Sequence, residues 1–128
     1  MVKQYLSSLL FFIIIDGFWL VFVAPNFYRT HIGHLMKPQA DLLAASLFYL
    51  LFLVGLNVFV ISPKRNEPLH IVAAYGALFG LITYATFDLT SVAVFKGFSY
   101  LVAGIDMLWG AFLCAAISVL TLRFKQNA

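Results

Sequence analysis

Residues 5–24 read YLSSLLFFIIIDGFWLVFVA, and this stretch is apolar over the length that a bilayer-spanning helix needs. Comparable apolar stretches occupy residues 40–61, 69–94 and 99–122. They are continuous and lack the alternation of a membrane β-barrel strand, which favours helices. The sequence therefore predicts an all-α integral membrane protein, a four-transmembrane-helix bundle that forms a single domain over residues 1–128.

The composition excludes most other classes of protein. The 128 residues are 63% hydrophobic and only 10% charged, with a mean hydropathy of +0.99. A soluble domain carries about 25% charged residues, so a soluble enzyme, a disordered protein and a nucleic-acid-binding module are excluded. The net charge of +3 comes from scattered basic residues. We therefore expect membrane lipids as partners, and no nucleic acid.

Basic residues in the short loops predict the orientation. Four spans place the N-terminus, the loop between the second and third spans and the C-terminal tail on one side. That side holds Lys3, Lys64, Arg65, Arg123 and Lys125, and the opposite side holds Arg29, Lys37 and Lys96. This excess predicts that both termini of the multi-pass protein lie in the cytoplasm.

Apolar residues recur at helical spacing within residues 25–39, which predicts a short amphipathic helix in the membrane interface after the first span. The first span could alternatively be a cleaved signal peptide. However, Asp16 interrupts its apolar core, and the bulky Phe22 lies where a cleavage site needs a small residue. We therefore expect the first span to be retained.

Three aspartates within the predicted spans need an explanation. An aspartate at the centre of a bilayer costs about 2.5–3.5 kcal/mol on insertion scales, and such residues usually mark functional sites. At a rise of about 1.5 Å per residue, Asp16 lies near the middle of the membrane, Asp106 in the outer half and Asp88 near the outer end. All three are expected to line one crevice that opens away from the cytoplasm.

Donor side chains recur beside these aspartates. Trp19 and Trp109 each follow an aspartate by three residues, and an indole N–H can satisfy a carboxylate. Tyr84 lies one helical turn before Asp88, and we expect its hydroxyl to reach that carboxylate. The predicted ligand-binding set is Asp16, Trp19, Tyr84, Asp88, Thr90, Asp106 and Trp109.

Other polar and small residues have a structural interpretation. Gly76 and Gly80 predict a close helix contact, and exposed glycine and aromatic faces could also join two copies into a homodimer. Ser46, Tyr49 and Asn57 form one polar stripe of the second span, which packing alone could explain. His31 and His34 have the spacing of metal ligands, with Asp41 as a third, but interfacial histidines more often contact water or head groups. No metal site and no cofactor are predicted.

The motifs D16-GFWL with Tyr28, Y75-GALFG leading into T83-YATFDLT, and D106-MLWG resemble a bacterial family of predicted small membrane proteins named for a domain of unknown function, DUF2177. The chain has Phe87 and Ser91 where that family usually has tyrosine and asparagine. The resemblance covers nearly the whole chain. It implies a four-helix inner-membrane protein and implies no established activity.

The residues leave three functions open. The first is a small binding protein, channel or transporter whose carboxylates handle a proton, a cation or a small polar or lipid ligand. The second is a membrane-embedded enzyme that acts on a lipid or isoprenoid, with the aspartates as acid, base or ligands. The third is a structural or accessory subunit whose aspartates pair with a partner helix. Binding or transport ranks first.

Overall fold

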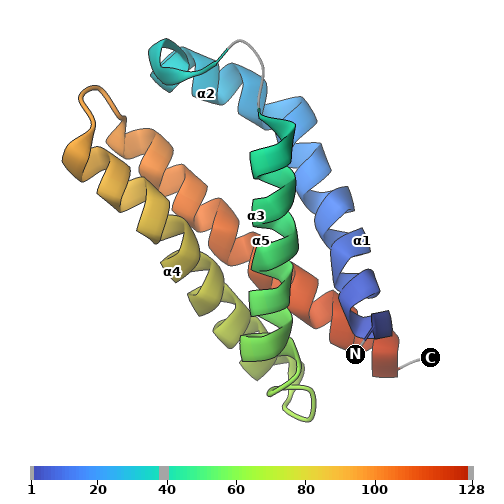
Figure 1. Cartoon of the computed structure of the whole chain (residues 1–128). Coiled ribbons are helices and arrows are strands. Elements are labelled where there is room, and N and C mark those ends of the chain that lie inside the picture. The colour runs from blue at the N-terminus through green and yellow to red at the C-terminus, as the bar shows by residue number, and fades with distance from the viewer. Residues whose placement is uncertain (1, 38–40, 127–128) are drawn as a thin grey trace.

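The computed structural model describes residues 2–37 and 41–126, and within these residues every regular element is helical (Figure 1). Four helical stretches of this part are long and apolar enough to cross a membrane, which confirms the all-α, four-helix architecture. The start predicted for the second span, at Ala40, lies outside the described residues. The elements are α1 (Val2–Phe18), η1 (Trp19–Val23), α2 (Ala24–Ile32), η2 (Gly33–Leu35), α3 (Leu42–Leu56), η3 (Asn57–Ile61), α4 (Leu69–Val94) and α5 (Tyr100–Gln126).

The first helix does not end at Ala24, where the sequence predicts its end. It continues through one π-helical turn, η1, whose wider ring is closed by the Ala24 N–H donating to the Trp19 carbonyl. Pro25 then lies in the first turn of α2, where its missing N–H costs little. The short helix predicted after the first span is therefore α2, joined to α1 without a break. α2 turns across the upper end of the molecule in Figure 1.

α4 and α5 form an antiparallel pair with the most extensive contact of the fold, and α1 packs against α5. η3, which continues α3, contacts α4 and α5, and Phe52 in the lower half of α3 also contacts α4. In Figure 1 the α4–α5 pair leans away from the upper half of α3, so the bundle opens toward the end that α2 covers. Both termini and the α3–α4 turn lie at the opposite end.

Small residues allow the close contact between α4 and α5. A Cβ added at Gly80 would overlap the carbonyl oxygen of Gly110 and lie 2.6 Å from its carbonyl carbon. One added at Gly76 would lie 2.8 Å from the carbonyl oxygen of Cys114. The predicted glycine contact is thus made within the chain. Because α5 covers this face, these glycines do not form the surface of a homodimer.

A buried polar network joins α1 to the lower end of α3. The Gln4 amide donates to Asn57 Oδ1 at 2.9 Å and to Ser62 Oγ at 2.9 Å, and the Asn57 amide donates to Ser8 Oγ at 3.0 Å. Ser46, predicted to share a stripe with Asn57, is exposed. The two residues differ because Asn57 lies at the lower end of α3, where it bonds to α1, whereas Ser46 lies in the upper half, from which the α4–α5 pair leans away (Figure 1).

The α4–α5 turn and η2 close the upper end. Gly97 has φ of 79°, a left-handed conformation that favours glycine. A Cβ at this position would lie 2.7 Å from His34 Nε2, so the imidazole packs directly on the turn. This contact anchors the segment after α2 over the ends of α4 and α5.

Candidate functional site

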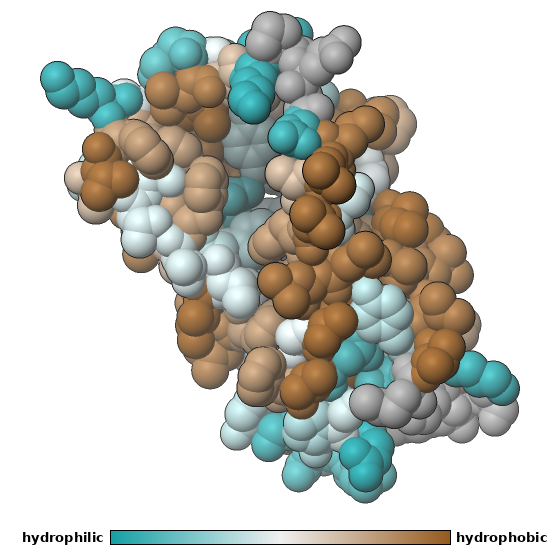
Figure 2. All heavy atoms as spheres, viewed as in Figure 1, coloured by the Kyte–Doolittle hydropathy of each residue, from teal (hydrophilic) through white to brown (hydrophobic). Residues whose placement is uncertain are grey.

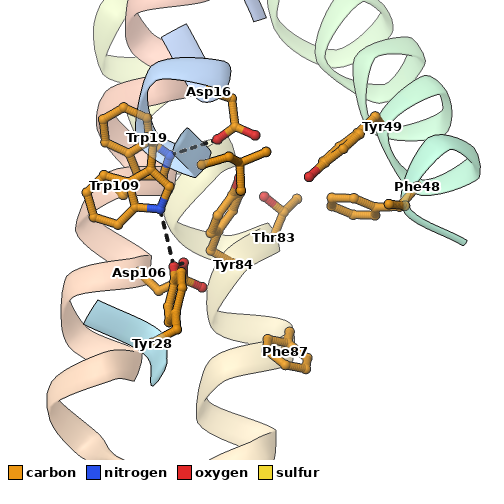
Figure 3. A pocket seen from close by; sticks show the side chains of 12 residues that line it. Asp16, Trp19, Tyr28, Phe48, Tyr49, Thr83, Tyr84, Phe87, Asp106 and Trp109 are labelled. Carbon is orange, nitrogen blue, oxygen red and sulfur yellow. Dashed lines mark hydrogen bonds between the residues drawn. The ribbon is translucent and has the colours of Figure 1, made fainter. Parts of the chain in front are cut away.

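Cavity 1, of about 440 Å³, lies within the opening between the helices. One wall is formed by residues of α1, η1 and α5, and the facing walls are formed by residues of α3 and α4 (Figure 3). Tyr28 of α2 lines the cavity as well. Its volume is in the range of small-molecule sites in proteins. The lining consists of aromatic and small apolar residues with two carboxylates: Asp16, Trp19, Leu20, Tyr28, Ala45, Phe48, Tyr49, Thr83, Tyr84, Phe87, Asp106 and Trp109.

The two carboxylates of cavity 1 accept hydrogen bonds from other helices. Trp109 Nε1 of α5 donates to Asp16 Oδ1 at 3.1 Å. The Tyr28 hydroxyl of α2 donates to Asp106 Oδ1. The pairing expected from the sequence, each aspartate with the tryptophan three residues later, is therefore not the recorded one. Asp16 pairs with the tryptophan of the opposite helix.

The two indoles form a stack between the carboxylates. Trp19 and Trp109 lie with ring centroids 4.4 Å apart and planes inclined by 14°. Trp19 Nε1 donates to the Tyr28 hydroxyl at 3.4 Å, which extends the chain of hydrogen bonds to Asp106. Because each ring is held by both a stack and a hydrogen bond, the stack fixes how α1 faces α5 at this level (Figure 3).

Cavity 1 opens sideways between α3 and α4. Phe48 of α3 and Phe87 of α4 line it and are 48% and 59% exposed. Phe52 closes the gap one turn below, where its ring meets Phe79 at 5.7 Å and Tyr84 at 6.1 Å. Figure 2 shows a hollow between the upper part of α3 and α4, with hydrophilic side chains at its floor, apolar ones along the α3 side and many residues of near-neutral hydropathy along the α4 side.

Cavity 2, of about 290 Å³, lies toward the α4–α5 turn. Tyr28, Phe87 and Asp106 line both cavities and form the partition between them. Asp88 lines cavity 2 and is 0% exposed. In the described part of the chain, neither of its carboxyl oxygens has a hydrogen-bond donor. The remaining lining is apolar and consists of Ile32, Met36, Phe98 and Val102.

The structure divides the predicted set among three places. Cavity 1 is lined by Asp16, Trp19, Tyr84, Asp106 and Trp109, whereas Asp88 lines cavity 2. Thr90 lines neither cavity. It is exposed, and its hydroxyl donates to the Phe87 carbonyl at 3.0 Å and to the Thr86 carbonyl. The single crevice expected from the sequence is thus two cavities that share Asp106.

Tyr84 and Tyr28 have different surroundings from those that the sequence indicates. Tyr84 was expected to reach Asp88, but it lines cavity 1 and its ring covers Gly110, where an added Cβ would lie 2.8 Å from Tyr84 Cδ2. Tyr28 belongs to the motifs of the family resemblance, yet its place in a predicted interfacial segment gave no reason to pair it with an aspartate. Its pairing could have been predicted from the position of Tyr28 one turn after Pro25, had the helix been expected to continue from α1 through the proline.

The histidines lie outside the cavities. The His31 ring meets Phe27 edge-on at 4.9 Å, and His34 covers the α4–α5 turn. Among the residues that the structure describes, no group of three or more histidine, cysteine or acidic side chains is placed to hold a metal ion.

The sequence was compared with protein-family models, with curated proteins and with solved structures. No curated protein and no solved structure matches it. A family model described as "Predicted membrane protein (DUF2177)" matches residues 1–123. A match of this extent, together with the four apolar helices, confirms the family that the motifs resemble: the chain belongs to the DUF2177 family of multi-pass membrane proteins.

Proposed function

We propose that the protein binds an amphiphilic ligand whose cationic head group occupies cavity 1 and whose apolar tail remains among the lipid chains. One observation carries this proposal. Cavity 1 combines two carboxylates with a wall of aromatic rings, and among the described residues no lysine, arginine or histidine lines it.

The carboxylates favour a positively charged head group. Asp16 is 3% exposed, and Asp106 is partly buried. Each accepts one hydrogen bond from a neutral donor, Trp109 or Tyr28. Removing an ionised carboxylate from water is costly unless a compensating charge is present. An ammonium group would supply that charge.

The aromatic lining favours an ammonium group over a smaller ion. Trp19, Tyr28, Tyr49, Tyr84 and Trp109 all line the cavity. The face of an aromatic ring attracts a cation within about 6 Å, and aromatic cages recognise alkylated ammonium groups. A volume of about 440 Å³ accommodates such a head group with the first part of its tail.

The sideways opening favours a ligand that enters from the bilayer. Its rim consists of Phe48 and Phe87, and α3 meets α4 only below it. An alkyl tail could pass between these helices while the head group stays at the carboxylates. This route supports binding from the lipid phase over conduction along the bundle axis, and the same opening would admit a lipid substrate to an enzyme.

Tryptophan fluorescence tests the proposal directly, because both tryptophans of the chain line cavity 1. We expect dodecyltrimethylammonium to quench the fluorescence of the protein in phosphatidylcholine nanodiscs with saturation. Asp16→Asn should weaken this binding about tenfold, which corresponds to about 1.4 kcal/mol. Dodecyl sulfate should not bind at the same site.

Asp41→Asn is the matched control, because Asp41 is exposed and caps α3 by accepting from the Ala44 N–H, a role that asparagine also fills. Its affinity should equal that of the wild type. Equal saturable quenching by the sulfate, or an unchanged affinity in Asp16→Asn, would contradict the proposal.

We further infer that the chain lies in the bacterial inner membrane with both termini in the cytoplasm. Lys3, Lys64, Arg65 and Arg123 belong to the end that carries the termini, and the sequence adds Lys125. The opposite end carries Arg29, Lys37 and Lys96. This difference follows the positive-inside rule.

Cysteine labelling of intact cells tests this orientation. In a Cys114→Ala background, a membrane-impermeant maleimide should label Lys96→Cys in the α4–α5 turn. It should label Asn66→Cys in the α3–α4 turn only after permeabilisation, since both positions are exposed. The reverse pattern would place the termini outside.

A further inference from the structure

Asp88 is a buried carboxyl group for which the fold provides no hydrogen-bond donor among the described residues. The residue is 0% exposed. Asp16 and Asp106, in contrast, each accept a hydrogen bond. Buried polar groups in native proteins are nearly always hydrogen-bonded, so an ionised Asp88 without a partner is not a stable arrangement.

The group that faces Asp88 is another carboxyl group. Asp106 of α5 lies within hydrogen-bonding reach of it across the α4–α5 contact, and Tyr28 of α2 also lies near it. These two are the titratable side chains that share cavity 2 with Asp88, and its other lining residues are apolar. An ionised carboxylate only accepts hydrogen bonds, so two ionised carboxylates cannot satisfy one another.

A positive charge must therefore enter between the two carboxyl groups. A metal ion would need about six oxygen ligands, whereas cavity 2 offers two carboxyl groups and one phenol in an apolar surround. A proton needs only the two carboxyl groups, since the O–H of one donates to the other. The oxygen atoms of cavity 2 are therefore better suited to hold a proton than a metal ion.

We propose that Asp88 and Asp106 hold one proton between them and form a proton-exchange site in cavity 2. The O–H of Asp88 donates to Asp106, and Asp106 Oδ1 accepts from the Tyr28 hydroxyl at the same time. Loss of the proton to water in cavity 2 leaves both carboxylates ionised, and uptake restores the hydrogen bond. This site shares Asp106 with the head-group site of cavity 1, but holding the proton does not require a ligand in cavity 1.

Infrared spectroscopy of the protein in nanodiscs, with ¹³C-labelled aspartate, measures this proton. The wild type at neutral pH should show the C=O band of a protonated aspartic acid. Asp88→Asn should remove the band completely, and it should still fold because the amide N–H can donate to Asp106. Asp41→Asn, at an exposed aspartate, should leave the band unchanged.

Absence of the band in the wild type would overturn the proposal without the need for any variant. A band of full intensity in Asp88→Asn would also overturn it. Loss of the band on addition of sodium ions at constant pH would show that a metal ion takes the site instead. None of these measurements uses a cavity-1 ligand, so this proposal and the binding proposal can fail separately.

Discussion

Replacement of Gly80 by alanine is expected to cause a large loss of stability, because the added Cβ would overlap the Gly110 carbonyl group. The Gly110 atoms belong to the backbone of α5, and the position of a Cβ is fixed by the backbone of α4, so no side chain can rotate away to relieve the contact. Overpacking of this kind costs about 1–3 kcal/mol and occasionally more. We expect about 3 kcal/mol here, since α4 and α5 would have to separate along their main contact.

Gly104→Ala is the matched control on α5. An added Cβ at Gly104 meets no atom within 4 Å, so this variant should keep the unfolding temperature of the wild type. Thermal unfolding in lipid nanodiscs, followed by tryptophan fluorescence, gives the comparison. Equal unfolding temperatures for the two variants would show that the α4–α5 contact is looser than described.

The glycine contact also sets the geometry of the site. Gly110 lies beneath the Tyr84 ring, and Gly80 lies against Gly110. The same close contact brings Asp88 of α4 to Asp106 of α5, two turns farther along α4 than Gly80. A wider α4–α5 spacing would therefore separate the two carboxyl groups and move Tyr84. Packing and the candidate site depend on the same small residues.

The apolar runs of the sequence were sufficient to predict the helices, because a bilayer leaves few other ways to satisfy the backbone. The aspartates within these runs could also be recognised as candidate site residues, because a charged side chain in the bilayer is costly. Which donor meets which aspartate could not be predicted, since it depends on the rotation of each helix about its axis. Trp109 meets Asp16 rather than Asp106 because α1 and α5 face each other through the indole stack.

Local backbone changes account for the remaining differences. The π turn at Trp19–Val23 lets the first helix pass Pro25 and brings Tyr28 over Asp106. Such turns add one residue to a helical turn and have no clear sequence signature, so predictions based on regular helical spacing fail beyond them.

Asp106→Asn is expected to have the largest effect on function, because Asp106 alone among the aspartates lines both cavities. Its loss removes one charge from the head-group site and one acceptor from the proton site. We expect the affinity for dodecyltrimethylammonium to fall about 100-fold, or about 2.8 kcal/mol. The infrared band should also vanish although Asp88 is still present, because the new amide donates to Asp88 and makes the proton unnecessary.

The wild type should also link the two sites. An ammonium group and the proton compete for the Asp106 carboxylate, so binding of one disfavours the other by the same free energy. Probe affinity should therefore rise as pH rises, and each binding event should release protons into the buffer. Asp106→Asn should abolish this pH dependence, whereas Asp16→Asn should weaken binding and keep the dependence. Calorimetry in buffers of different ionisation enthalpy measures the protons released. Equal proton release by the wild type and Asp106→Asn would mean that the two cavities act independently.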